Sequence, residues 1–461
     1  MIKVGNECRV VAFLKLIIRR NCILNTIKKV FTFIILAILF VGNLGLTATG
    51  VYAQEPVELV FWHGMGGNAG EALQRLVDEF NESQDGIIVN AQYQGTYDET
   101  LTKLRSSASG SEVGADIVQV FELGTTFMID SGLTVPVQNY IDASGYDISQ
   151  IEPNLAAYYT IDGQLNSMPF NSSTPIMYYN ADIFEAAGIE EAPSSLAEII
   201  EISPQLQEAG AAMPISLQIY GWYLEQWFSK QEEDIYDNGN GREGAPTETV
   251  FVENGAMEKT ISKWLEGMEA GAIPNVGRTG GQPEFVAGQS AITIGSTASL
   301  RQILTEVDGR FEVGTAYFPG VDEEDQGGVS IGGASLWMIE SGDDAKKQAT
   351  WKFIEFLISP ESQAKWNRDT GYFPITTATH EEQVFLDNLA EFPQFQTAID
   401  QLHESTPESQ GALSGVNQEA RQIYETELEN VLNGSSDPAT ATQSMADQVN
   451  AALENYNAAN Q

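Results

Sequence analysis

Residues 57–121 alternate between strand-like and helix-like segments, and this alternation constrains the fold more than any other feature of the chain. Three segments rich in β-branched and aromatic residues are typical of strands: 57–63, 86–94 and 115–122. Two helix-like segments separate them, 69–80 and 97–109, and the first has apolar residues at the spacing of one helix face, Leu73, Leu76, Val77 and Phe80. Strands that alternate with helices predict an α/β fold with a parallel sheet. The last third of the chain is predicted to be mainly helical, at 349–358, 418–432 and 441–456.

The first 53 residues have the pattern of a secretory signal. Seven lysines and arginines precede the apolar run 30–41, and small residues follow it up to Ala53. A membrane anchor is the alternative, but the run is shorter than the roughly 20 residues of a spanning helix. Cys8 and Cys22 both lie in this segment, and no cysteine directly follows the apolar run, as a lipoprotein would require. We therefore expect a periplasmic protein, cleaved after Ala53, that is not a lipoprotein and has no disulfides.

The chain is strongly acidic, with 23 Lys and Arg against 64 Asp and Glu. Without residues 1–53, which hold seven of the bases and one acid, 16 bases and 63 acids remain, a net charge of −47. This balance argues against nucleic acid and against anionic membrane surfaces as partners. Adaptation for solubility explains most of it, and an anionic ligand would need a locally positive site.

The sequence lacks the patterns of common catalytic and metal sites. No two of its three histidines, His63, His380 and His403, have the spacing of a shared metal site, and neither a nucleophile elbow nor a phosphate loop is present. We therefore expect no metal, no cofactor and no enzymatic activity. Aromatic residues next to Gly-rich or Ser-rich stretches, as in segment 221–228, favour recognition of sugars or polyols, although core packing explains most single aromatic residues.

Four segments together resemble the extracellular solute-binding proteins of ABC importers, most closely the members that bind glycerol-3-phosphate: IVQVFELGTTFMI (117–129), PFNSSTPIMYYNADIF (169–184), IGGASLW (331–337) and TGYFPIT (370–376). The resemblance implies a two-lobed α/β protein of type II, with hinge crossings and the ligand in the cleft between the lobes. It places a first lobe at 54–170 with a return near 300–360, and a second at 171–299 with C-terminal helices near 361–461. It also implies a monomer that delivers its ligand to permease and ATPase subunits in the membrane.

The resemblance implies the ligand contacts residue by residue. Four positions would surround the ligand: Tyr97, Ser173, Ser296 and Gly333. Tyr372 and Arg421 would lie on the phosphate side, and Glu122 would accept hydrogen bonds from glycerol hydroxyls. These donors suit a phosphate ester, which accepts hydrogen bonds only, and an arginine adds charge-assisted bonds. Without the resemblance, Arg421 would be read as a surface arginine and Glu122 as a turn residue or helix cap.

One position departs from the family pattern. In PSSLAEII (193–200), Leu196 stands where the glycerol-3-phosphate-binding member has a tryptophan. The smaller wall predicts room for a glycerophosphodiester such as glycerophosphocholine, unless Trp222 takes over the lost packing. Aromatic residues of segment 221–228 could then contact a choline cation.

Three other functions stay open from the sequence. A sugar or oligosaccharide receptor would not need Arg421 together with the serines. An exported phosphodiesterase or glycosidase would turn over its ligand. A structural or adhesive protein should show repeats, and the sequence has none.

Overall fold

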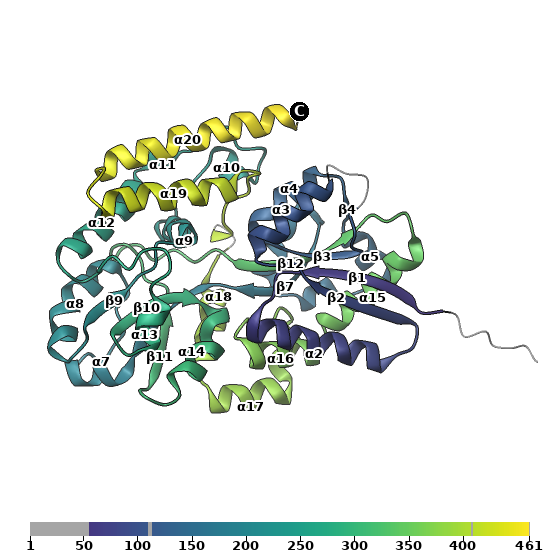
Figure 1. Ribbon diagram of the computed structural model, residues 1–461, viewed down its shortest axis with the longest axis horizontal. Helices are drawn as coiled ribbons and strands as arrows, with labels where there is room; N and C mark the ends of the chain where they lie inside the picture. Colours follow the sequence, from purple (N-terminus) through teal and green to yellow (C-terminus); the bar gives the residue numbers. More distant parts are fainter. Residues whose placement is uncertain (1–54, 109–112, 407–408, 461) are drawn as a thin grey trace, which may run out of the picture. The chain divides into compact units, whose positions relative to one another are not determined.

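Two sheets with helices packed around them organise the protein (Figure 1). The computed structural model describes residues 55–108, 113–406 and 409–460, so the predicted signal at 1–53 lies outside the described residues. The first sheet has the strand order β2-β1-β3-β12-β4, with β7 also paired to β12: β2 Ile87–Tyr93, β1 Val57–His63, β3 Ile117–Phe121, β12 Gly332–Ile339, β4 Thr134–Val135 and β7 Met168–Ser173. The second has the order β11-β8-β10-β9: β11 Val313–Tyr317, β8 Pro175–Asn180, β10 Ser290–Ser296 and β9 Met213–Ser216.

The predicted strand-helix alternation is confirmed in the first sheet. Strand β1 pairs in parallel with both β2 and β3, while β12 runs antiparallel to β3, β4 and β7. Every residue of β3 is buried, as expected for a central strand covered on both faces. The apolar face of α2 (Gly67–Ser83) includes the four residues that the periodicity identified. The α/β prediction is therefore correct.

Helices cover both sheets. Around the first sheet lie α2, α3 (Tyr97–Ala108), α4 (Thr125–Asp130), α5 (Gln138–Ser144), α6 (Pro153–Tyr159), α15 (Asp344–Leu357), α16 (Pro360–Thr370) and α17 (Gln383–Glu391), with the short pair β5 (Thr160–Ile161) and β6 (Gln164–Leu165). Around the second lie α7 (Ala181–Ala187), α8 (Leu196–Glu208), α9 (Gly221–Gln231), α11 (Phe251–Asn254), α12 (Ala256–Glu269), α13 (Gln282–Val286) and α14 (Leu300–Val307). The short element α10 (Asp237–Gly241) has positive φ angles at its three central residues and no buried side chain. The C-terminal helices α19 (Asn417–Leu432) and α20 (Pro438–Ala459) pack side by side and join the core of the second sheet (Figure 1). None of the described helices combines the length and the apolar character of a membrane-spanning segment.

The chain crosses between the sheets at Thr174. Strand β7 ends at Ser173 in the first sheet, and β8 begins at Pro175 in the second. Thr174 is fully buried, and its hydroxyl accepts a hydrogen bond of 3.1 Å from Nε2 of Gln401 on α18 (Phe395–Glu404). The Gln401 side chain also accepts a hydrogen bond of 2.6 Å from the backbone N–H of Phe318, where the chain leaves β11 to return to the first sheet. One glutamine therefore ties two crossing segments together.

Two parts of the predicted lobe division need correction. Strand β11 pairs with β8 in the second sheet, so the return to the first sheet occurs only with β12 and not from about residue 300. Helix α16 packs on α2 of the first sheet, although residues beyond 361 were assigned to the second lobe. Local patterns identify a strand or a helix, but the sheet that an element joins depends on contacts distant in sequence.

Candidate functional site

A cavity of about 320 Å³ collects most of the residues predicted to contact a ligand. Its wall is formed by segments that are far apart in the sequence: Tyr97, Phe121, Glu122, Ser173, Gln218, Tyr220, Trp222, Tyr223, Gln282, Ile294, Gly295, Ser296, Ala298, Ser299, Gly333 and Tyr372. The structure thus brings together Tyr97, Glu122, Ser173, Ser296, Gly333, Tyr372 and Trp222. Arg421 and Leu196 are not among the lining residues.

Tyr97 is placed by the start of its helix. The sequence Thr96-Tyr97-Asp98-Glu99 forms reciprocal cap bonds, in which the Glu99 N–H donates to the Thr96 hydroxyl at 3.3 Å and the Thr96 N–H donates to the Glu99 carboxylate at 2.7 Å. Tyr97 is then the first residue of α3, and its ring stacks on Phe121 with a centroid distance of 5.4 Å.

A chain of hydrogen bonds orients the Tyr97 hydroxyl. The Gly64 N–H donates to the Gln119 side chain at 2.9 Å, and Nε2 of Gln119 donates to Oδ1 of Asn171 at 2.7 Å. Nδ2 of Asn171 then donates to the Tyr97 hydroxyl at 2.7 Å, which lies 3.4 Å from the Tyr372 hydroxyl. Burial raises the pKa of both tyrosines, so both hydroxyls stay protonated and can donate at neutral pH.

Tyr372 is positioned by the end of α16. Gly371 ends this helix with a φ of 112°, a conformation that favours glycine. The Tyr372 ring stacks on Trp366 with a centroid distance of 5.6 Å, and its carbonyl accepts a hydrogen bond of 2.8 Å from Asn367. The aromatic stack therefore fixes the ring plane while the hydroxyl reaches the cavity.

Two serines contribute hydroxyls from the sheet ends. Ser173 is the last residue of β7, and its hydroxyl has no hydrogen-bond partner among the described residues. Ser296 is the last residue of β10, and its oxygen accepts a hydrogen bond of 3.2 Å from the Ala298 N–H. A hydroxyl that accepts this bond still has its proton to donate. Both serines can therefore donate to an acceptor in the cavity.

Gly333 is required by the backbone. Its φ is 91°, and a Cβ atom at this position would lie 2.0 Å from the Asn171 carbonyl oxygen. The pairing of β12 with β7 shifts register directly after it, between Ala334 and Ser335. The glycine was predicted to let a ligand approach closely, and the structure adds a second reason, the close approach of strand β7.

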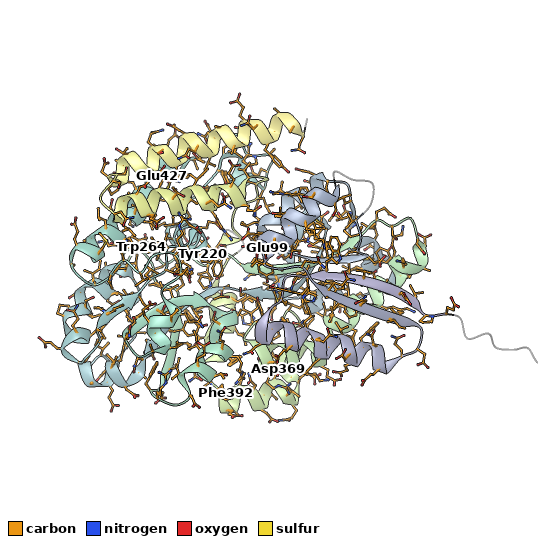
Figure 2. The ribbon with its side chains drawn as sticks, viewed as in Figure 1. Glu99, Tyr220, Trp264, Asp369, Phe392 and Glu427 are labelled. Carbon is orange, nitrogen blue, oxygen red and sulfur yellow. The ribbon has the colours of Figure 1, made fainter. Side chains whose placement is uncertain are left out.

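Trp222 forms an aromatic wall with an unused donor. Its side chain is buried, and its Nε1 has no hydrogen-bond partner among the described residues. The indole packs against Gly332, where a Cβ atom would lie 2.5 Å from the ring. Tyr220, the residue before α9, is labelled in Figure 2. The centroid of its ring lies 6.0 Å from that of the Trp222 ring.

Arg421 is held between two carboxylates. Its Nε donates to Oε1 of Glu225 at 2.7 Å, and its Nη2 donates to Oε2 of Glu225 at 2.7 Å and to Oε1 of Glu122 at 2.8 Å. The side chain of Arg421 is 7% exposed, that of Glu122 7% and that of Glu225 17%. Arg421 lies on a buried face of α19 with Tyr424 and Leu428. It is not a free cation, however, because the group of three side chains carries one positive and two negative charges when all are ionised.

Burial and pairing act in opposite directions on these groups. Burial raises the pKa of the Glu122 carboxyl above its usual value, against the opposing effect of Arg421. Burial alone would lower the pKa of the Arg421 guanidinium, but Glu225 and Glu122 raise it well above its usual value. Arg421 is therefore always charged, and Glu122 gains a proton on acidification more readily than an ordinary glutamate does.

Leu196 lies in the core and not at the cavity. Ser194 and Ser195 cap α8 through Glu198, with the Glu198 N–H donating to the Ser195 hydroxyl at 3.1 Å. The cap makes Leu196 the first helical residue, and its side chain is fully buried in the apolar core around the second sheet. This corrects the interpretation of Leu196 as a wall of the ligand space.

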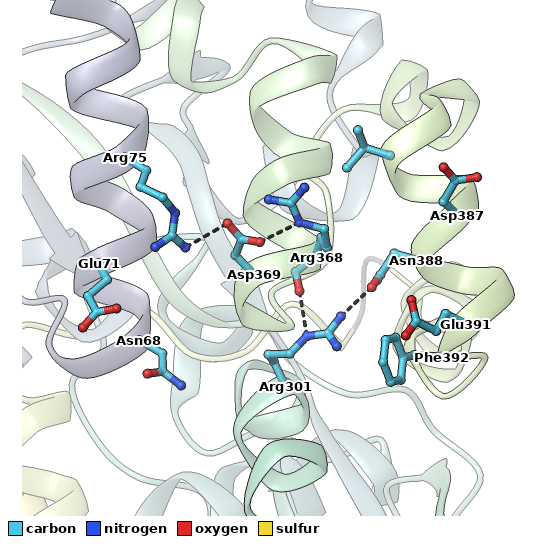
Figure 3. Close-up of a pocket in the computed structure, with 11 residues that line it drawn as sticks. Asn68, Glu71, Arg75, Arg301, Arg368, Asp369, Asp387, Asn388, Glu391 and Phe392 are labelled. Atoms are coloured by element: carbon cyan, nitrogen blue, oxygen red, sulfur yellow. Dashed lines mark hydrogen bonds and ion pairs between the residues drawn. The ribbon is translucent and has the colours of Figure 1, made fainter. Parts of the chain in front are cut away.

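A larger hollow of about 620 Å³ lies elsewhere, between α2, α14, α16 and α17 (Figure 3). It contains three arginines, but Arg75 and Arg368 both bond to Asp369, at 2.9 and 2.6 Å. Arg301 donates to the Arg368 carbonyl at 2.7 Å and stacks over Phe392. Since the side chains of Arg75 and Arg368 are 57% and 45% exposed, this hollow is an open, internally paired surface. The smaller cavity, with buried and unused donors, is the better candidate for a ligand site.

Sequence reasoning missed part of the cavity wall and the partner of Arg421. Tyr223 lies within the stretch 221–228 that was singled out for its aromatic content, and Tyr220 directly precedes it, so a signal for both existed. Nothing local indicates that Glu225 pairs with Arg421, which lies 196 residues further along the chain. Among the described residues, no group of three His, Cys, Asp or Glu side chains is arranged to hold a metal ion.

Comparisons with known proteins agree with this architecture. Residues 75–394 match the family described as bacterial extracellular solute-binding protein. The sn-glycerol-3-phosphate-binding periplasmic protein UgpB of Salmonella typhimurium is 32% identical over 427 residues, covering 90% of this chain and 96% of that protein. Its counterpart in Yersinia pseudotuberculosis is 30% identical over 450 residues, covering 95% and 99%.

Solved structures show the same fold. UgpB from Mycobacterium tuberculosis in complex with glycerophosphocholine has a TM-score of 0.72 and 21% identity, covering 88% of this chain and 99% of that one. The cyclic α-maltosyl-1,6-maltose-binding protein from Arthrobacter globiformis has a TM-score of 0.71 and 21% identity, covering 87% and 100%. One backbone architecture therefore occurs with ligands of different chemistry.

Proposed function

The chain belongs to the bacterial extracellular solute-binding proteins, and on that premise we propose that it is the periplasmic receptor of an ABC importer for a glycerol phosphate ester. The ligand is glycerol-3-phosphate or a glycerophosphodiester such as glycerophosphocholine. The receptor is a monomer without enzymatic activity, exported by a cleaved signal at residues 1–53. It binds its ligand in the cavity at Tyr97, closes its lobes and presents the closed form to the permease and its ATPase.

One observation carries the proposal. Six residues selected through their likeness to glycerol-3-phosphate receptors, between Tyr97 and Tyr372, line a single cavity although they come from separate elements. The curated relatives that carry that ligand in their names match nearly the whole chain.

The donors of the cavity fit such a ligand. The hydroxyls of Tyr97, Tyr372, Ser173 and Ser296 can all donate to phosphate oxygens. Glu122 is the carboxylate among the lining residues and suits the hydroxyls of glycerol. Arg421 lies directly behind Glu122 and reaches the phosphate if Glu122 turns toward the glycerol.

A neutral sugar is the second candidate. It is favoured by the pairing of Arg421 with Glu122 and Glu225, because a paired arginine attracts an anion less strongly. With both carboxylates ionised, the group around Arg421 is net negative, and the cavity wall has the aromatic character that suits the C–H faces of sugars. A sugar would bind through Trp222, Tyr220 and Glu122 without using Arg421.

Native mass spectrometry of the protein purified from its own cells tests the proposal. A co-purifying glycerol phosphate ester is the expected result, and it should be released unchanged after long incubation with the protein. A co-purifying oligosaccharide would contradict the ligand class, and a hydrolysed ester would contradict the role as a receptor.

A further inference from the structure

We infer that Glu225 is a positioning and specificity residue that orients Arg421 and limits its effective charge, so that the site prefers a phosphate group with one negative charge over one with two. The inference rests on the proposed function and specifies its ligand as a phosphodiester. Neither the family resemblance nor any sequence pattern had drawn attention to Glu225.

The geometry fixes the guanidinium. Glu225 contacts Arg421 with both carboxylate oxygens, on Nε and on Nη2, each at 2.7 Å. Two parallel bonds to one planar group leave it little rotational freedom. Glu122 contacts the same guanidinium through a single oxygen on Nη2, at 2.8 Å. Glu225 is therefore the stronger determinant of where Arg421 points.

The helices that carry the pair are locked together. Helix α9 begins at Gly221, where a Cβ atom would lie 3.0 Å from the Cα and Cβ atoms of Arg421, so the glycine allows α19 to approach. The Gly221 N–H donates to Oε1 of Glu425 on α19 at 3.0 Å. Both helices pack in the core around the second sheet, whereas Glu122 follows β3 of the first sheet. A movement between the sheets would separate Arg421 from Glu122 but not from Glu225.

The charge around Arg421 follows from this arrangement. Once Glu122 has turned to a glycerol hydroxyl, Arg421 and Glu225 remain as a neutral pair beside the phosphate. Arg278, which contacts the next turn of α19, gives no extra positive charge, because it is already paired with Glu425 and Glu429, at 3.0 and 3.1 Å. A second negative charge on the ligand would therefore meet Glu122 and Glu225, and no lysine or arginine of the described part of the chain lines the cavity to balance it. The buried setting strengthens that repulsion.

Two ligands that differ only in phosphate charge test the inference. Glycerol-3-phosphate and its methyl phosphodiester are titrated calorimetrically at pH 8, where the monoester carries two charges because its second pKa is about 6. The wild-type protein should bind the methyl diester about tenfold more tightly. Equal or tighter binding of the monoester by the wild type would overturn the inference, and this arm requires no variant.

Glu225→Gln separates charge from shape. The amide keeps one acceptor for Arg421 but removes the negative charge, so the preference for the diester should fall by about tenfold. Glu419→Gln is the matched control, since it removes one charge from an exposed position on α19. Glu225→Asp keeps the charge but shortens the side chain, so it should weaken both ligands equally. An equal effect of Glu225→Gln on both ligands would show a merely structural role, while a wild type that binds neither ester would contradict the proposed function instead.

Discussion

Removal of the Arg421 side-chain charge should destabilise the protein in a way that depends on pH. Arg421→Met keeps most of the buried volume but leaves Glu122 and Glu225 without a cation. Three charge-assisted hydrogen bonds are lost at once. Breaking a buried ion pair by removing one partner costs about 3–5 kcal/mol of unfolding free energy. We expect a loss in this range at pH 8.

Protonation of Glu122 should relieve part of that cost. Burial already raises the pKa of the Glu122 carboxyl in the wild type, and without Arg421 the pKa rises further. A carboxyl with a folded-state pKa above its unfolded value lowers stability as the pH rises from the unfolded pKa to the folded pKa. The variant should therefore be less destabilised at pH 5 than at pH 8, by about 1.4 kcal/mol for each unit of additional rise in the pKa of Glu122.

Urea denaturation at both pH values, followed by tryptophan fluorescence, measures the effect. Arg310→Met is the control, because Arg310 is exposed and donates to backbone carbonyls such as that of Val307 instead of to a buried carboxylate. Its loss of stability should be smaller and independent of pH. Adding Glu225→Gln to Arg421→Met should recover part of the stability, since one unpaired charge is removed. An equal loss at pH 5 and pH 8 would refute the reasoning about Glu122.

Three further changes probe the site and its support. Gly333→Ala should lower the free energy of unfolding by about 3 kcal/mol or more, because the strain of a positive φ adds to the clash with Asn171. Chemical denaturation measures this loss, and a value below about 1 kcal/mol would show that β12 and β7 separate easily. Asn171→Ala should weaken ester binding about tenfold in calorimetry, because it removes the hydrogen bond that orients the Tyr97 hydroxyl. An unchanged affinity would show that this hydroxyl does not contact the ligand. Leu196→Trp should lower the free energy of unfolding by about 1–3 kcal/mol, because the larger side chain overpacks a buried position. The preference between monoester and diester should stay the same, and a changed preference would show that Leu196 contributes to the ligand site.

Local signals predicted much of the fold. The apolar face predicted from periodicity is the buried face of α2, and the strand predicted at 115–122 is β3 at Ile117–Phe121. The lobe to which an element belongs could not be predicted in the same way. Strand β11 and helix α16 have ordinary local patterns, and only their packing on β8 and α2 assigns them to a sheet.

The candidate site shows the same division. Tyr97 and Tyr372 stand next to recognisable helix signals, the cap box at Thr96 and the terminating Gly371, so their placement could be derived locally. The hydrogen-bond chain through Gln119 and the clamp of Glu225 on Arg421 join residues from separate elements, and no pattern in a single sequence encodes such pairs.

Calorimetric titration of the wild-type protein with glycerophosphocholine, glycerol-3-phosphate and maltose tests the central claim most directly. The account predicts saturable binding of one or both glycerol phosphate esters at a single site, with no heat from maltose. Binding of maltose without binding of either ester would contradict it.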